Sequence, residues 1–167
     1  MALKSDRSTL QTDISFFMNE AATRGGVVSL STGGSGAAMD QGAALVTYSA
    51  LPSGAVPVGL LVNDMVNIDL TRQHLNQHKD EVQKGGKVTL LTKGWVVTDA
   101  IEGTAPSAGS PAYLAHSGNL AISDVSSDDS DDSGDTRIVG RFLSSKDQDG
   151  YAKVFIDLPN TNKPNPA

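Results

Sequence analysis

The chain has 167 residues, enough for one domain with short appendages, and its hydrophobic fraction of 38% supports a modest core. Aromatic residues make up only 5%, so the core must rest on aliphatic side chains, and the absence of cysteine excludes disulfides, thiolate metal sites and cysteine nucleophiles. The sequence shows no signal-peptide pattern and no apolar run of about 18 residues, so we expect a soluble protein without a membrane partner.

The net charge of −6 has one local source. Six aspartates lie between Asp124 and Asp135, and subtracting them from the 19 acidic residues leaves 13, which equals the 13 Lys and Arg residues. The rest of the chain is therefore about neutral and shows no basic face, so we expect no direct binding of nucleic acid.

Residues 1–24 differ from the rest because apolar side chains recur there at helical spacing. Leu10, Ile14 and Phe17 fall on one helical face, and two glycines follow as a stop signal. This pattern predicts a short amphipathic helix on an N-terminal arm of residues 1–26. Helix patterning does not name the partner, so packing on the chain's own barrel and docking on a neighbouring subunit both stay open.

Short apolar runs separated by Gly, Pro, Asn and Asp turns replace this pattern further along the chain. The expected strands are Val27–Leu30, Ala44–Tyr48, Val56–Met65, Val88–Leu91, Trp95–Ile101, Pro111–Ala115, Leu120–Ser123, Ile138–Leu143 and Tyr151–Leu158. Strands at this spacing predict a mainly β fold, a small barrel or sandwich over residues 27–158. We expect the proline-rich tail of residues 159–167 to run extended over a surface.

His74 and His78 lie four residues apart, a spacing that would place both imidazoles on one face of a helix. A zinc site needs a third ligand, and metalloprotease chemistry needs a glutamate directly after the first histidine, where Leu75 stands. We interpret this segment as a polar connector and expect no metal site.

The acidic loop of residues 124–135 matches a calcium loop only in part. Asp129, Asp131 and Gly134 occupy positions 1, 3 and 6 of an EF-hand loop, but Gly140 stands at position 12, where a bidentate glutamate is required. Its repeated Ser and Asp residues are typical of a solvated loop with at most weak cation binding.

No arrangement of residues typical of an enzyme emerges from the sequence. Residues 33–36 are glycine-rich but lack the Lys-Ser/Thr of a P-loop, and Ser35 lacks the last glycine of a nucleophile elbow, because Ala37 stands there. We therefore expect no cofactor and no catalytic activity. The single tryptophan, Trp95, is interpreted as an anchor of the core or of a subunit contact rather than as a ligand stack.

Several β motifs follow one another in a definite order. They are Val56-Pro57-Val58-Gly59, Gly86-Lys87-Val88-Thr89-Leu90-Leu91, Lys93-Gly94-Trp95-Val96-Val97, Ala108-Gly109-Ser110-Pro111-Ala112-Tyr113, Ile138-Val139-Gly140-Arg141 and a last apolar strand from Tyr151 to Leu158. Over residues 26–159 this order resembles that of the small β-barrel decoration (cement) proteins of tailed-phage heads. The insertion of residues 67–85 and the acidic loop depart from the compact family pattern.

The resemblance implies a tulip-like β-barrel that forms a homotrimer on the outer surface of the capsid, after assembly in the host cytoplasm. It implies the major capsid protein and further copies of the chain as partners, with neighbouring capsid subunits clamped against the pressure of the packaged DNA. The candidate capsid or subunit contacts are Leu10, Ile14, Phe16, Phe17, Met18 and Trp95. We expect deletion of residues 1–24 to weaken capsid attachment while the barrel stays folded.

Two other functions remain open from the sequence. A receptor- or carbohydrate-binding β-module of a phage tail or fibre would need aromatic side chains on loop tips, and one Trp and three Tyr are available. A hydrolase with a scattered active site is the third.

Overall fold

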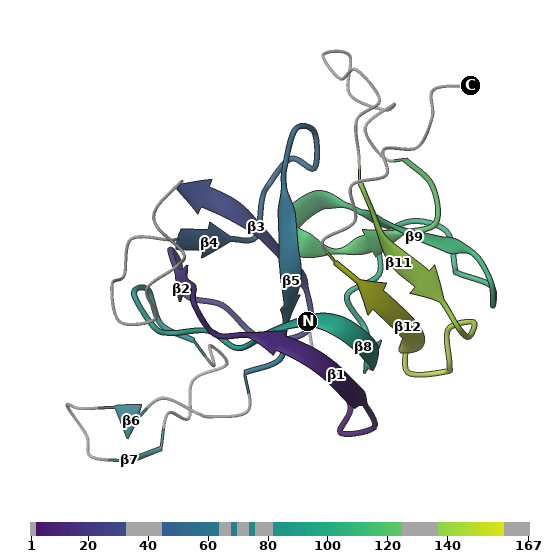
Figure 1. Ribbon diagram of the computed structural model, residues 1–167. Coiled ribbons are helices and arrows are strands. Elements are labelled where there is room, and N and C mark those ends of the chain that lie inside the picture. Colours follow the sequence, from purple (N-terminus) through teal and green to yellow (C-terminus); the bar gives the residue numbers. More distant parts are fainter. Residues whose placement is uncertain are drawn as a thin grey trace.

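The computed structural model describes residues 3–32, 45–63, 68–69, 74–75, 82–124 and 137–158, and these parts confirm a mainly β protein (Figure 1). The only helical element among them is a single 3-10 turn, η1. The elements are β1 (Ser8–Asp13), β2 (Phe17–Met18), β3 (Val27–Thr32), β4 (Leu45–Thr47), β5 (Pro57–Leu61), β6 (Ile68–Asp69), β7 (His74–Leu75), β8 (Leu90–Thr98), β9 (Pro111–Leu114), η1 (His116–Gly118), β10 (Leu120–Ala121), β11 (Ile138–Phe142) and β12 (Ala152–Asp157). The expected tail of residues 159–167 lies outside the described residues.

Ten strands form one open sheet with the order β10-β9-β11-β12-β8-β5-β3-β4-β2, and β1 is added beside β8. The strands β6 and β7 pair only with each other. Lys93 of β8 lies opposite Asp157 of β12 and Gln11 of β1, while Leu91 lies opposite Leu60 of β5 and also pairs with β1. One edge of β8 therefore holds β5 and β12 in succession, and β1 covers the other edge.

The prediction of a helix in the N-terminal segment is wrong, because the structure has the strands β1 and β2 there. An isolated helix of this length is marginal in water, whereas the edge of β8 offers a row of backbone partners. Leu3 is also buried in the core at 8% exposure, and Met18 is fully buried. Deleting residues 1–24 would remove core side chains, which corrects the expectation that the rest of the chain stays folded without them.

Apolar pairs of neighbouring residues explain how the central strands are built. Successive side chains of a strand point to opposite faces, so two consecutive buried residues require cover on both faces. Val27 and Leu60 belong to one buried cluster, whereas the next residue along each strand, Val28 and Leu61, belongs to another. The strands β3 and β5 thus form a wall between two cores.

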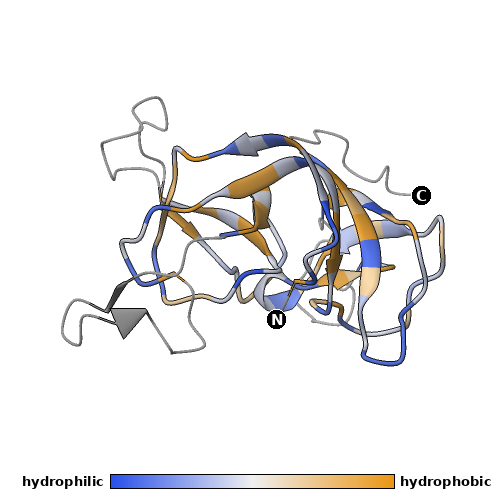
Figure 2. Ribbon diagram, turned by 90° about the horizontal axis from the view of Figure 1, so that it is seen from below, coloured by the Kyte–Doolittle hydropathy of each residue, from blue (hydrophilic) through white to orange (hydrophobic). Residues whose placement is uncertain are grey.

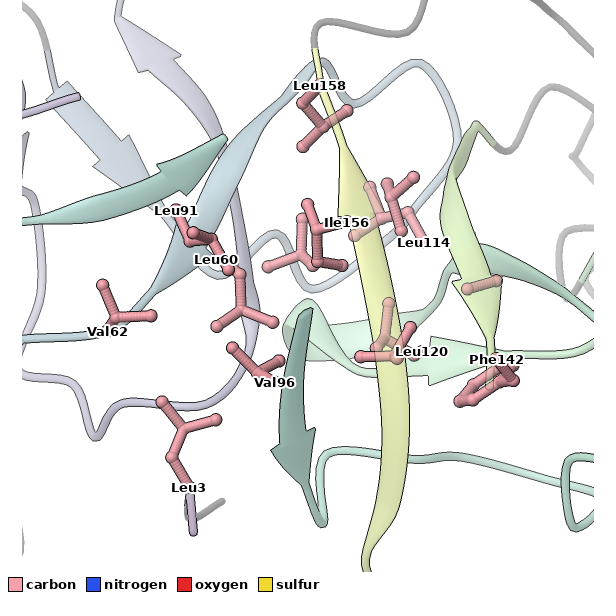
Figure 3. Packing of buried hydrophobic residues seen from close by; sticks show 14 of the residues in the cluster. Leu3, Leu60, Val62, Leu91, Val96, Leu114, Leu120, Phe142, Ile156 and Leu158 are labelled. Atoms are coloured by element: carbon pink, nitrogen blue, oxygen red, sulfur yellow. The ribbon is translucent and has the colours of Figure 1, made fainter. Parts of the chain in front are cut away.

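The larger core gathers side chains from both halves of the sequence (Figure 3). Its buried members are Leu3, Val27, Leu60, Val62, Leu91, Val96, Ala112, Leu114, Leu120, Val139, Phe142, Ala152, Val154, Ile156 and Leu158. The smaller core contains Met18, Ala22, Val28, Val46, Leu61, Val82, Val88 and Leu90. Figure 2 shows hydrophobic residues on the strands in the middle of the molecule and hydrophilic residues on the connecting loops.

Both ends of the open sheet return to segments that flank β8. At one end, the Met18 amide donates to the Gly86 carbonyl at 2.9 Å, just before β8 begins. At the other end, the Leu120 amide donates to the Ala100 carbonyl at 3.0 Å, just after β8 ends. These two bonds link each end of the sheet to a segment that flanks β8.

Gly140 in β11 lies where the backbone of β12 approaches most closely. A Cβ atom at this position would lie 1.8 Å from the Phe155 carbonyl oxygen, well inside contact distance. A glycine inside an apolar strand indicates either a bend or a close backbone approach, and here the structure shows the close approach. Gly94 plays the same part beside β1, because its Cβ would lie 2.2 Å from the Ser8 carbonyl oxygen.

An exposed ion pair ties the N-terminal segment to the β11–β12 connection. The Lys4 ammonium donates to the Asp147 carboxylate at 2.6 Å, and its Nζ lies 4.4 Å from the ring centroid of Tyr151. The hydrogen bond raises the pKa of Lys4 and lowers the pKa of Asp147. Asp147 also accepts from the Tyr151 amide, so this carboxylate orders the connection as well as Lys4.

Candidate contact surfaces

Aromatic side chains are scarce in this protein, and most of them are not in its cores. Phe142 is the only one of the eight aromatic residues that is fully buried. The others, all partly exposed, are Phe16, Phe17, Tyr48, Trp95, Tyr113, Tyr151 and Phe155. Large apolar rings left at the surface in a group are typical of sites that another molecule covers.

Trp95 and Phe155 lie directly opposite each other on β8 and β12. Their neighbours Val96 and Val154 are fully buried in the larger core, so strand alternation places both rings on the outer face of the sheet. The Lys153 ammonium lies 3.4 Å from the ring centroid of Trp95, which is a cation–π contact.

We define the aromatic face as Trp95, Val97, Arg141, Lys153 and Phe155. Arg141 of β11 is opposite Phe155, and Lys153 is opposite Val97, so all five residues share one side of three adjacent strands. None of the five is buried. The face therefore combines an apolar centre with two cationic side chains.

Of the cationic side chains in and beside the aromatic face, Lys93 has an acidic partner and Arg141 has none among the residues that the structure describes. Lys93 and Asp157 pair with each other at 3.6 Å, and both are about half exposed. Arg141, by contrast, is exposed and forms no ion pair with any residue that the structure describes. The face thus carries local positive charge on a protein whose net charge is −6.

The edge of β1 adjoins the aromatic face, because Ser8 lies opposite Trp95. A β-bulge follows Thr9, so Leu10 is an extra residue in the strand and is 65% exposed. Ile14, just after β1, is 42% exposed. Among the described strands β1 has a single neighbour, and an edge strand of this kind is a common place for contacts with another chain.

The structure separates the six contact residues proposed from the sequence. Leu10 and Ile14 are exposed in and just after β1, and Trp95 is partly exposed on the neighbouring strand β8. Phe16 is half-buried against the smaller core, Phe17 lies 5.9 Å from the Lys87 ammonium, and Met18 is fully buried, where no partner can touch it. Sequence reasoning missed Phe155, Lys153 and Arg141, although the alternation of polar and apolar residues after Tyr151 was a signal for an outward-facing row.

The described part of the chain contains no group of three or more side chains suited to hold a metal ion. His116 Nδ1 lies 2.9 Å from the Glu102 carboxylate, and this contact fixes the turn at η1. His74 lies in β7, while His78 and nearly all of the acidic loop lie outside the described residues. In the same parts of the chain no helix is long and apolar enough to cross a membrane.

Comparison with known families gives one match that spans most of the chain. Residues 6–157 match the phage family described as "Structural cement protein (E217 gp24/Pam3 gp6)". The matched region includes β1 and the whole of the aromatic face. No individual curated protein matches the chain.

Proposed function

Because the chain belongs to the family of phage structural cement proteins, we propose that it binds the outer surface of a tailed-phage capsid and bridges neighbouring major capsid subunits. The family assignment supports a structural role in stabilising the capsid and an association with capsid proteins. Bridging of two subunits goes beyond the family assignment, and it is supported by two adjoining contact regions on one molecule, the aromatic face and the β1 edge. Binding to the outer surface of the capsid is proposed from the family resemblance alone.

A protein that contacts two subunits gains from each contact it adds. Once the first region is bound, the second binds at a high effective concentration, so two weak contacts give a firm attachment over a repeating lattice. The aromatic face lies on β8 and β12, and β1 lies on the other edge of β8. Both regions are therefore held rigidly relative to each other, which suits a clamp.

The homotrimer and assembly in the host cytoplasm are also part of this proposal, and both come from the family resemblance. Three copies around one axis would present three aromatic faces to the lattice and multiply the attachment. Sedimentation equilibrium of the purified protein tests the trimer. A single species of about 52 kDa, three times the chain mass of 17.3 kDa, is expected.

The sequence predicts a barrel, and the structure has one open sheet. We infer that this sheet curls so strongly that its two ends approach β8. The support is the pair of returns described above, from Met18 to Gly86 and from Leu120 to Ala100.

Co-sedimentation with capsid shells tests the proposed function. Purified protein is added to expanded shells of the same virus that lack it, and the copies bound per major capsid subunit are counted. Saturable binding at a fixed ratio supports the proposal. Shells that bind none of the protein would contradict it.

The competing function is a receptor- or carbohydrate-binding module of a phage tail or fibre. It expects aromatic rings on loop tips, whereas Trp95 and Phe155 lie on strands of the sheet. Tyr151 lies in the β11–β12 connection, but its ring is in contact with the Lys4 ammonium. A glycan array is the direct comparison between the two functions.

A further inference from the structure

The outer residues of β8 and β12 contribute little to the cores of the fold. Val96, Val154 and Ile156 fill the larger core from the inner side of these strands. Trp95 and Phe155, on the other side, form a cross-strand pair whose rings remain partly in water. Two of the few aromatic residues in the chain are therefore placed where they stabilise a contact rather than the core.

We propose that the aromatic face docks on a patch of the major capsid protein that has an apolar centre and acidic side chains at its rim. This inference rests on the proposed function and names the partner chemistry of one of its contact regions. Arg141 supplies the specific polar contact, and Trp95 with Phe155 supplies the apolar area.

The composition of the face fits a protein partner. Trp and Arg are the residues most enriched among those that dominate binding energy at protein interfaces, and they act best near an apolar centre shielded from water. Val97 extends the apolar area beside Trp95, and the Lys153 ammonium lies over the Trp95 ring. A surface of this kind loses unfavourable hydration when another protein covers it.

The charges select an acidic partner. Arg141 is exposed and forms no ion pair within the described parts of the chain, so its guanidinium is available to a carboxylate in a two-bond contact. Lys153 adds a second positive charge close by, while Lys93 is already balanced by Asp157. A partner with carboxylates opposite Arg141 complements this arrangement.

Other occupants fit less well. Two copies of the chain that met face to face would bring Arg141 and Lys153 of one copy against those of the other, which is repulsive. A trimer contact would instead join this face to a different surface of a second copy, and a lower oligomeric mass of Arg141→Glu in sedimentation equilibrium would identify that occupant and overturn the inference. Nucleic acid would need a wider basic surface than two cations, since its affinity grows with the number of phosphates neutralised. A carbohydrate would stack on Trp95 but would leave Arg141 without an anionic partner.

Charge reversal at Arg141 gives the sharpest test. The variant Arg141→Glu changes an exposed side chain and should leave the thermal unfolding midpoint close to that of the unchanged protein. Lys84→Glu is the matched control, because it makes the same change of charge at an exposed residue before β8, beside the smaller core. Binding to shells that lack the protein is measured by co-sedimentation over a range of protein concentrations.

We expect Arg141→Glu to weaken shell binding by at least about tenfold, and Phe155→Ala by a similar factor. Lys84→Glu should bind within about twofold of the unchanged protein. Raising the salt from about 50 mM to about 500 mM should weaken shell binding of the unchanged protein more steeply than that of Arg141→Gln. Salt screens the ion pair between Arg141 and the partner, and the Gln variant cannot form this pair.

The outcomes separate this inference from the proposed function. If the unchanged protein binds shells and Arg141→Glu binds equally well, the aromatic face is not the docking surface while the cement function stands. If the unchanged protein does not bind at all, the proposed function itself fails. Binding to an immobilised glycan that Phe155→Ala abolishes, with shell binding intact, would identify a carbohydrate as the occupant and overturn the inference.

Discussion

Leu3 and Leu10 allow a direct test of whether the N-terminal segment is part of the fold. Both are leucines on the same short segment, but Leu3 is 8% exposed within the larger core and Leu10 is 65% exposed at the β1 bulge. We predict that Leu3→Ala destabilises the protein strongly and that Leu10→Ala barely does. A free arm would give two small and equal effects.

The magnitudes follow from the burial of each side chain. Replacing Leu by Ala removes three carbon atoms, worth about 2.4 kcal/mol of transfer free energy when fully buried. The cavity left at Leu3 adds to this, so we expect a loss of about 3 kcal/mol. Leu10 has about a third of its surface covered, which limits its loss to about 0.8 kcal/mol.

Thermal unfolding followed by circular dichroism measures the difference. For a chain of this length, each kcal/mol shifts Tm by about 2–4 °C, so Leu3→Ala should lower Tm by about 6–12 °C and Leu10→Ala by less than about 3 °C. Urea unfolding gives the same comparison in free energy, provided that the slope is unchanged. Equal shifts for the two variants would refute the placement of Leu3 in the core.

Three further predictions concern single contacts. Gly140→Ala should cost at least about 3 kcal/mol in urea unfolding, because its Cβ would lie 1.8 Å from the Phe155 carbonyl oxygen; a loss below about 1 kcal/mol would contradict this approach of β11 and β12. Thr98→Val should cost about 2 kcal/mol or more, since the buried hydroxyl donates to one backbone carbonyl and accepts from one amide; an unchanged urea midpoint would argue against these bonds. The hydrogen bond from Lys4 lowers the pKa of Asp147, so its stabilisation is complete above the ordinary value of 3.8 and is lost as pH falls through the lower folded value. A carboxyl NMR titration should place the Asp147 midpoint below 3.8 and move it upward in Lys4→Met, and an identical midpoint in both proteins would exclude the pair.

The sequence predicted the strand content well, because burial in a sheet leaves a direct mark on the pattern. Short apolar runs with turn residues between them mark β5, β11 and β12. The turn expected between the strands Val88–Leu91 and Trp95–Ile101 is wrong, because β8 runs unbroken from Leu90 to Thr98 and pairs with β5, β12 and β1 along its length. Gly140 was also recognisable, since a glycine inside an apolar strand indicates that another backbone approaches closely.

The N-terminal segment and the aromatic face could not be predicted in the same way. Leu10 and Ile14 repeat at a helical interval, yet pairing with β8, about 80 residues later in the chain, decides the conformation there. Trp95 and Phe155 are 60 positions apart, and nothing local indicates that they face each other. Both features depend on contacts between segments that are distant in the sequence.

The position of β8 has a mechanical consequence. β1 and β12 run antiparallel to β8 on its two edges, so they run parallel to each other. β1 begins beside Trp95 and β12 ends beside Lys93, so the start of β1 and the end of β12 point towards opposite ends of β8. A force that pulls these two ends apart along the strand direction would shear both ladders at once, because their hydrogen bonds lie across the direction of pulling. Many bonds would have to break together before the chain extends, and a molecule that carries tension between neighbouring subunits benefits from that geometry.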